Sequence, residues 1–196
     1  MSQGLLLHTC CAPCATYVVK RLGEEGWQPS LFWYNPNIHP YAEHQQRLEC
    51  LRRFAQGTGV PLVLAPAYDM VAYFRLVVSH EDKAERCLRC YRLRLSQTAQ
   101  MAQRQGFAAF STTLLISPYQ KHELLKEVSY EVAREHGLTF FYQDMRPGYR
   151  ESRRMARELG LYRQRYCGCL YSEWERHIQE RSRGTTAVSP KPEVQR

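Results

Sequence analysis

The residues best suited to chemistry in this chain are its cysteines. Seven of the eight fall into three short groups, made of Cys10, Cys11 and Cys14, of Cys87 and Cys90, and of Cys167 and Cys169. Clustered cysteines in a chain without a visible secretory signal more often bind metal or do redox chemistry than form disulfides. The grouping therefore predicts a metal centre or a redox site assembled from three distant parts of the chain.

The spacing within the groups gives the thiols a common direction. Residues three apart lie on one face of a helix, so Cys11 and Cys14 can point the same way. The same holds for Cys87 and Cys90. Free backbone N–H groups at a helix start also stabilise thiolates, and Gly168 allows a sharp turn between the last two cysteines. Four thiols complete a cubane cluster, and three others can hold a second metal with one position open.

Two other uses of these cysteines stay open. A zinc-stabilised RNA-binding module would use the CxxC pairs, although a single zinc ion leaves three thiols unexplained. A thiol–disulfide oxidoreductase would place CxxC after a strand and at a helix start, as residues 11–14 do. That alternative explains neither Cys10 nor the two distant groups. Cys50 stands alone on a predicted helix, and we interpret it as a core residue.

Short apolar runs alternate with amphipathic stretches along the chain. Strands are predicted at residues 4–8, 31–34, 62–65, 108–111 and 139–142. Helices are predicted at residues 15–22, 41–56, 70–78, 87–105 and 123–136, with an arginine-rich helical stretch within 144–166. This order predicts an α/β fold, in which helices cover both faces of a parallel sheet and ligands bind beyond the carboxyl ends of the strands.

Length and composition predict one globular domain. A chain of 196 residues, 44% of them hydrophobic, can bury its own core without staples. We expect residues 1–180 to form a single metal-binding catalytic domain and residues 181–196 to form a disordered basic tail. The early apolar run is too short for a signal or a membrane span, so we expect a cytoplasmic protein without membrane contact.

The charge of the chain favours a polyanionic partner. The formal net charge is +8, and seven arginines face three acidic residues between positions 144 and 166. A basic balance of this kind is typical of proteins that bind nucleic acid. A solvated helix face is the alternative interpretation of the same run.

Four motifs in this order resemble a known family. They are HTCCAPC at residues 8–14, ERCLRCY at 85–91, STTLLISPYQ at 111–120 and YRQRYCGC at 162–169. Together they resemble epoxyqueuosine reductases of the QueH type. The resemblance implies reduction of epoxyqueuosine to queuosine at the wobble position of tRNA, without cobalamin. It also implies a Rossmann-like fold similar to the adenine-nucleotide alpha-hydrolases, although their glycine-rich phosphate loop is absent and we expect no ATP.

The same resemblance implies the cofactors and partners. These are a [4Fe–4S] cluster, an additional mononuclear iron, tRNA carrying epoxyqueuosine and an external electron donor that the sequence does not identify. All seven grouped cysteines then become metal ligands. We expect the cluster on Cys10, Cys11, Cys87 and Cys90. We expect the single iron on Cys14, Cys167 and Cys169.

Several polar residues are candidates for proton transfer and substrate binding. The candidate proton donors are His8, Tyr119, Asp144 and Tyr166. For His8 the alternative is a histidine that only orients a cysteine. The candidate substrate-binding residues are Ser111, Thr112, Thr113, Ser117, Gln120, Arg146, Tyr149, Tyr162 and Arg163.

Two of these polar patterns have plainer structural interpretations. The hydroxyl run at residues 111–113 would also suit a helix cap or a turn. Glu43 and Arg47 lie one helical turn apart, and we expect them to form a surface ion pair.

Overall fold

A single parallel sheet forms the centre of the computed structural model, which describes residues 3–185. Its strands are β1 (Gln3–His8), β2 (Trp27–Trp33), β3 (Leu62–Leu64), β4 (Ala109–Thr112) and β5 (Thr139–Phe140). All neighbours pair in parallel, in the order β3-β2-β1-β4-β5. The predicted α/β fold with a parallel sheet is confirmed.

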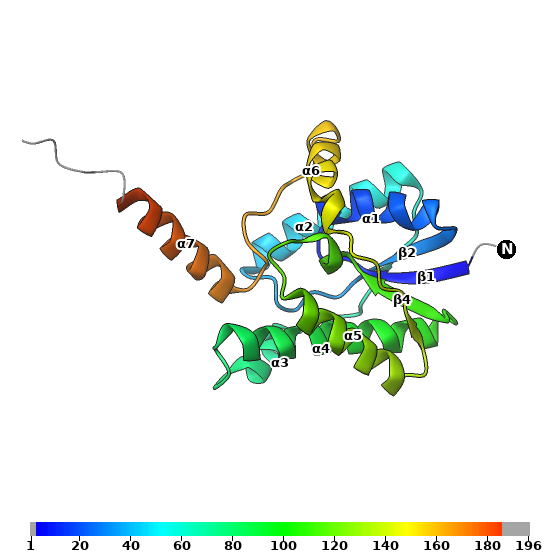
Figure 1. Ribbon diagram of the computed structural model, residues 1–196, viewed down its shortest axis with the longest axis horizontal. Coiled ribbons are helices and arrows are strands. Elements are labelled where there is room, and N and C mark those ends of the chain that lie inside the picture. Colours follow the sequence, from blue (N-terminus) through cyan, green and yellow to red (C-terminus); the bar gives the residue numbers. More distant parts are fainter. Residues whose placement is uncertain (1–2, 186–196) are drawn as a thin grey trace, which may run out of the picture.

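Helices cover both faces of this sheet (Figure 1). One face carries α1 (Ala12–Glu24), α2 (Tyr41–Thr58) and α6 (Tyr149–Glu158). The other carries α3 (Met70–Val77), α4 (Lys83–Arg104) and α5 (His122–Glu135). There are two short 3-10 helices in the described chain: η1 (Thr113–Ile116) directly follows β4, and η2 (Arg146–Gly148) directly precedes α6.

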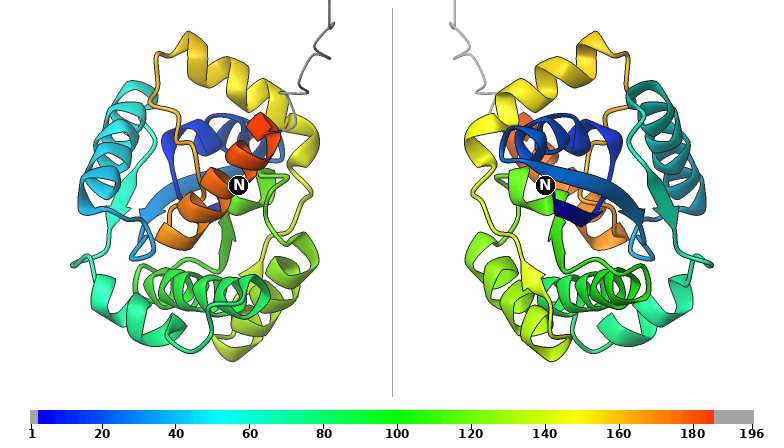
Figure 2. Two further views of the ribbon diagram at one scale, coloured as in Figure 1. Left: turned by 90° about the vertical axis from the view of Figure 1, so that its left-hand side faces the viewer. Right: turned by 90° about the vertical axis from the view of Figure 1, so that its right-hand side faces the viewer.

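Helix α7 (Leu170–Thr185) extends away from the body of the molecule (Figure 1). In the left panel of Figure 2, which shows the molecule from the left-hand side of Figure 1, α7 lies in front of the sheet, at the edge where the strands end. The helix continues past residue 180, the predicted end of the domain. The rest of the predicted basic tail, residues 186–196, lies outside the described residues.

The core forms around the central strand. Leu5, Leu6 and Leu7 are all fully buried, because β1 is covered by helices on both faces and paired with a strand on each side. Cys50 is 1% exposed and packs in the same core from α2. The interpretation of Cys50 as a core residue is therefore confirmed.

The strand order reverses at β1, which pairs with β2 on one side and with β4 on the other. His8 at the end of β1 lies opposite Thr112 at the end of β4. The loops that follow these two strands therefore leave the sheet side by side. Open parallel sheets bind their ligands in the crevice at such a reversal, and the first cysteine group follows β1 directly.

Two of the differences from the predicted helix boundaries concern the cysteine and arginine motifs. Helix α4 begins at Lys83 rather than at Cys87, because the carboxylate of Asp82 accepts a hydrogen bond of 2.8 Å from the backbone N–H of Ala84 and caps the helix. Cys87 therefore lies in the second turn, away from the free N–H groups of the helix start. The arginine-rich stretch is an α-helix only over Tyr149–Glu158, and most of residues 159–169 form an irregular loop.

Gly148 marks the point where η2 and α6 pack on α1. A Cβ atom at this position would lie 2.1 Å from a ring carbon of Tyr17, so an alanine must displace the ring or the backbone. We expect Gly148→Ala to lower the free energy of unfolding by about 1–3 kcal/mol in a urea titration. The control is Gly57→Ala in α2, where nothing lies within 4 Å, and it should raise stability by up to about 1 kcal/mol. Equal stabilities of the two variants would contradict this packing.

Candidate metal centre

The first cysteine group lies at the start of α1. The Sγ atoms of Cys10, Cys11 and Cys14 all lie within 4.8 Å of one another, and all three residues are buried. Cys11 is the N-cap residue in extended conformation, and Pro13 stands in the first turn, where proline is favoured. The spacing thus gives Cys11 and Cys14 the common direction expected from the sequence.

The spacing of these three sulfurs suits a single metal ion. The Sγ atoms of Cys10 and Cys11 are 3.8 Å apart. A tetrahedral ion with sulfur ligands at about 2.3 Å holds its sulfurs about 3.8 Å apart. A cubane spreads its thiolates more widely, because its irons occupy alternate corners of a cube. The three sulfurs of the first group therefore lie close enough together to bind one metal ion.

The second group consists of Cys87, Cys90, Cys167 and Cys169. Cys90 and Cys169 pack in one small cluster with Tyr73. Burial raises the pKa of Cys87 to about 11 and that of Cys90 to about 12, with a smaller rise from the two cysteines of the loop. Within residues 3–185 these four sulfurs do not form a group as tight as the first.

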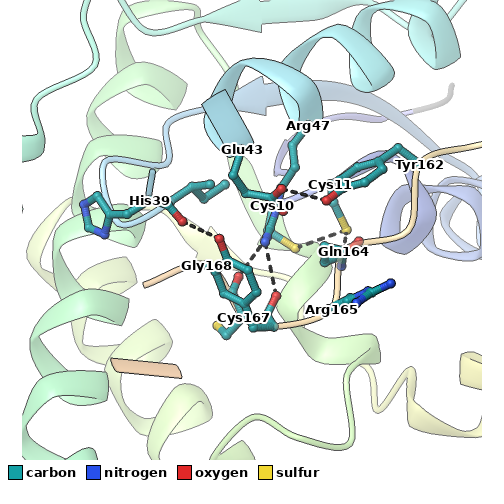
Figure 3. A network of polar contacts seen from close by, with 12 residues as sticks. Cys10, Cys11, His39, Glu43, Arg47, Tyr162, Gln164, Arg165, Cys167 and Gly168 are labelled. Atoms are coloured by element: carbon teal, nitrogen blue, oxygen red, sulfur yellow. Dashed lines mark hydrogen bonds and ion pairs between the residues drawn. The ribbon is translucent and has the colours of Figure 1, made fainter. Parts of the chain in front are cut away.

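A buried ion pair holds the loop that carries the third cysteine motif. Arg47 is 1% exposed, and its Nε donates to Glu43 at 2.7 Å. Its Nη atoms donate to the carbonyl oxygens of Cys167 at 2.9 Å and Tyr166 at 3.2 Å (Figure 3). Glu43 also accepts from the hydroxyl of Tyr162 at 2.6 Å. The expected surface location of the Glu43–Arg47 pair is wrong, because the loop covers both side chains.

Gly168 allows this loop to pass close to the segment after β2. Its φ is 151°, and a Cβ would lie 3.0 Å from both the Asn37 side-chain nitrogen and Cγ1 of Ile38. Its carbonyl oxygen accepts a hydrogen bond of 2.8 Å from the backbone N–H of His39. The sharp turn expected at Gly168 is confirmed, and close packing is a second reason for glycine there.

Arg94 brings a second guanidinium group to the cysteines. It is 1% exposed, and its Nη1 lies 3.8 Å from Sγ of Cys90. Its Nε donates to Nε2 of His8 at 3.3 Å and its Nη2 to Asn35 at 2.9 Å. Its charge also acts on Cys10 of the first group. Sequence reasoning missed Arg94, although it follows Cys90 by one helical turn on the same face of α4.

Two glutamine side chains donate hydrogen bonds to sulfur. Nε2 of Gln164 lies 2.9 Å from Sγ of Cys11, and Nε2 of Gln120 lies 3.5 Å from Sγ of Cys167. N–H donors of this kind stabilise thiolates and tune bound iron–sulfur centres. Gln120 is one of the predicted site residues, here as a neighbour of a cysteine. Gln164 was missed, since no periodicity marks a residue on an irregular loop.

The hydroxyl residues at the end of β4 are buried, and their hydrogen bonds go to other groups of the protein. Ser111 donates to the carbonyl oxygen of Phe141 at 2.8 Å. Thr112 caps η1, as the alternative interpretation of this run predicts. Thr113 alone reaches a cysteine: its Oγ1 accepts from the backbone N–H of Cys10 at 3.1 Å and lies 3.5 Å from the Sγ of that residue.

The environment of His8 does not suit a proton donor. Burial, together with the charge of Arg94, lowers the pKa of His8 to about 3, so the ring is neutral. Because arginine can only donate, Nε2 accepts from Arg94, and Nδ1 carries the proton toward Thr112 Oγ1 at 2.8 Å. His8 therefore orients a side chain, as the alternative interpretation holds, but that side chain is Arg94 rather than a cysteine.

Asp144 and Tyr166 are also engaged by neighbours. Arg146 donates two hydrogen bonds to Asp144, at 2.8 and 2.6 Å, and this contact lowers the pKa of that carboxyl to about 2. Asp144 is thus ionised near neutral pH and has no proton to give. The hydroxyl of Tyr166 donates to the carbonyl oxygen of His39, and burial raises its pKa.

The remaining predicted residues lie toward the surface. Tyr119 is 77% exposed and packs edge-on against Tyr149, with ring centroids 6.0 Å apart. Burial raises the pKa of Tyr149, and the charge of Cys14 contributes to that rise. Ser117 accepts from the backbone N–H of Tyr119 at 3.3 Å, and Arg163 is exposed on the loop.

Comparison with known proteins identifies the family. The family model described as epoxyqueuosine reductase QueH matches residues 5–175, which include all seven grouped cysteines. The chain belongs to the QueH family. A QueH-family relative from Dehalococcoides mccartyi, named epoxyqueuosine reductase QueH, is 46% identical over 176 residues, or 90% of this chain and 96% of the relative. A second relative of the same name, from Thermotoga maritima, is 33% identical over 179 residues, or 88% of this chain and 91% of the relative.

A solved structure supports the fold of this QueH-family chain. A predicted subunit of tRNA methyltransferase from Methanocaldococcus jannaschii superposes with a TM-score of 0.52 and 12% identity, over 80% of this chain and 74% of that one. At this identity the likeness concerns the fold alone. Within the described residues, no helix combines the length and the apolar character that crossing a membrane requires.

Removal of Arg47 should be costly because it leaves the buried Glu43 carboxylate without a partner of opposite charge, held only by the hydroxyl of Tyr162. We expect Arg47→Met to lower the free energy of unfolding by about 3–5 kcal/mol in a urea titration. Hydrogen exchange should rise at residues 166–168, because Arg47 holds the carbonyl groups of Tyr166 and Cys167. The control is Arg154→Met, which removes the exposed pair with Glu158 and should cost less than about 1 kcal/mol. A loss of stability no larger than that of the control would contradict the view that Arg47 holds this loop in place.

Proposed function

We propose that this chain is an epoxyqueuosine reductase that removes the epoxide oxygen from epoxyqueuosine at the wobble position of tRNA, with a [4Fe–4S] cluster and a mononuclear iron. The net reaction consumes two electrons and two protons and releases the oxygen as water. The observation that carries the proposal is the assembly of seven thiols into two adjacent groups in a member of the QueH family.

The residues at this place fit iron–sulfur chemistry. Every candidate ligand is a cysteine, and thiolates are the ligands of iron–sulfur clusters. Arg47 and Arg94 are buried beside them, with Glu43 as the one buried carboxylate at the site. A metal–thiolate centre carries net negative charge and so supplies the missing anion.

Sulfur spacing supports a division of ligands that differs from the expected one. The sequence-based expectation separated Cys14 from Cys10 and Cys11, whereas these three lie together with the spacing of a single-ion site. We therefore propose that they hold the mononuclear iron, with a fourth position open. The cluster would then bind the second, wider group, made of Cys87, Cys90, Cys167 and Cys169.

The protein side chains would orient both centres and the substrate. When bound, the cluster would supply electrons one at a time and the iron would act as a Lewis acid toward the epoxide oxygen. Gln164 and Gln120 orient sulfurs of the two groups. Tyr119 is the proton donor that we favour, since it is exposed and packs on Tyr149, on which the charge of Cys14 acts, while His8 and Asp144 are committed elsewhere.

The RNA would approach on the exposed side of the centre. Tyr119 and Tyr149 offer ring faces on which unpaired bases can stack, and Arg163 offers an exposed charge for phosphate. Arg146 can contribute less, because Asp144 already pairs with it. We place the enzyme in the cytoplasm, where a reducing environment keeps the thiols free and an external electron donor can reload the cluster.

Metal content and turnover test this function together. We expect anaerobically purified protein to contain roughly four to five irons per chain, from one cubane and one iron. It should convert epoxyqueuosine in tRNA to queuosine when a reductant is supplied, measured by chromatography of the digested nucleosides. Stoichiometric zinc with negligible iron and sulfide would favour the RNA-binding module instead. Turnover by metal-free protein would favour the thiol–disulfide oxidoreductase.

Single cysteine variants test the division of ligands. Cys14→Ala should lose one iron and keep most of the visible cluster absorbance, because its group binds the single ion. Cys169→Ala should bleach the cluster, because one of four ligands is lost. Cys50→Ala, in the core, should change neither. The measurements are the iron content and the visible spectrum of the same anaerobic samples. Loss of cluster absorbance in Cys14→Ala, with cluster absorbance retained in Cys169→Ala, would reverse the division of ligands.

A further inference from the structure

Arg94 differs from the other buried arginines of the described chain. Arg47 pairs with Glu43 at 2.7 Å, and Arg86 pairs with Glu175 at 2.5 Å. Arg94 has no carboxylate within ion-pair distance among residues 3–185, although it is as deeply buried as Arg47. Its positive charge is therefore not neutralised by a protein side chain of opposite charge.

The partners that hold Arg94 are neutral. Nε2 of His8 accepts from Nε of Arg94 and so carries no proton, which makes the ring neutral, while its other nitrogen is engaged by Thr112. Asn35 accepts from Nη2 and donates its own amide N–H to the carbonyl oxygen of Thr9 at 2.9 Å, which fixes its orientation. These contacts draw on β1, the end of β4 and the loop after β2. They hold the guanidinium in place without cancelling its charge.

The remaining neighbours of the guanidinium are sulfurs of both cysteine groups. Nη1 lies 3.8 Å from Sγ of Cys90, and the charge of Arg94 acts on Cys10 in the first group and on Cys167 in the second. Two charges that lie a few ångströms apart interact strongly when water is excluded from the space around them. Arg94 therefore acts on whatever charge the thiol groups and their metals carry.

We propose that Arg94 is a positioning residue whose uncompensated charge raises the reduction potential of the iron–sulfur cluster that Cys90 helps to bind. The inference rests on the proposed function. Each electron taken up makes the cluster more negative by one charge, and a fixed cation beside its ligands stabilises the reduced form more than the oxidised form. Net charge and hydrogen bonds at the sulfurs are established determinants of cluster potential.

Charge-changing variants at Arg94 and Asn35 test the proposal. The full chain with its cluster loaded is titrated anaerobically with dithionite, and the midpoint potential is read from visible absorbance and electron paramagnetic resonance. Arg94→Gln removes the charge, and Asn35→Asp keeps the guanidinium but adds a carboxylate beside Nη2. Both should shift the potential to more negative values. Arg94→Lys keeps the charge and should stay close to the wild type.

Two controls separate charge from structure. Asn35→Ala loses the same hydrogen bond to Thr9 as Asn35→Asp without adding a charge, and it should keep the wild-type potential. Arg92→Gln removes an exposed charge on the same helix and should also leave the potential unchanged. If Arg94→Gln fails to hold the cluster, the comparison of Asn35→Asp with Asn35→Ala decides.

Three results would overturn the proposal. One is a wild-type potential in both Arg94→Gln and Asn35→Asp. Another is a shift in Arg94→Lys as large as that in Arg94→Gln, which would mean that hydrogen-bond geometry rather than charge matters. A wild-type protein that binds no cluster would overturn the proposed function, and this inference with it.

Discussion

Buried positive charge is the constraint around which this site is built. Arg47 and Arg94 are each 1% exposed, and Glu43 is the one buried carboxylate in the described part of the chain. An ion that is buried without compensation costs several kcal/mol. The fold therefore needs anions at the same place, and thiolates are the groups available there. Metal binding deprotonates thiols, so a metal bound by these cysteines would also stabilise the fold.

The sheet topology brings these charges and thiols together from opposite layers. The strand order reverses at β1, so Cys10 follows β1 beside the end of β4. Arg47 comes from α2 on one face of the sheet, and Arg94 comes from α4 on the other. Neither helix alone could supply both charges. The site thus depends on the packing of both helical layers against the carboxyl edge of one sheet.

Local sequence patterns predicted which strands and cysteines form this site better than they predicted how those residues are arranged in space. Each strand was found from its apolar run, and the seven cysteines were found from residue type and spacing. The start of α4 was missed because a single capping carboxylate, that of Asp82, sets it. The division of the thiols depends on how three distant segments meet. Glu43 and Arg47 were assigned to the surface because helical spacing reveals a pair but not the loop that covers it.

That loop also couples the two cysteine groups. It carries Gln164, which contacts the first group, and Cys167, which belongs to the second and is exposed. An irregular segment has no internal hydrogen-bond ladder to fix it, so its position must come from outside contacts. Arg47 supplies them through two backbone carbonyl groups on the buried side, and Gly168 permits the close approach. The contacts on the buried side of the loop thereby hold Gln164 and Cys167 in place beside both cysteine groups.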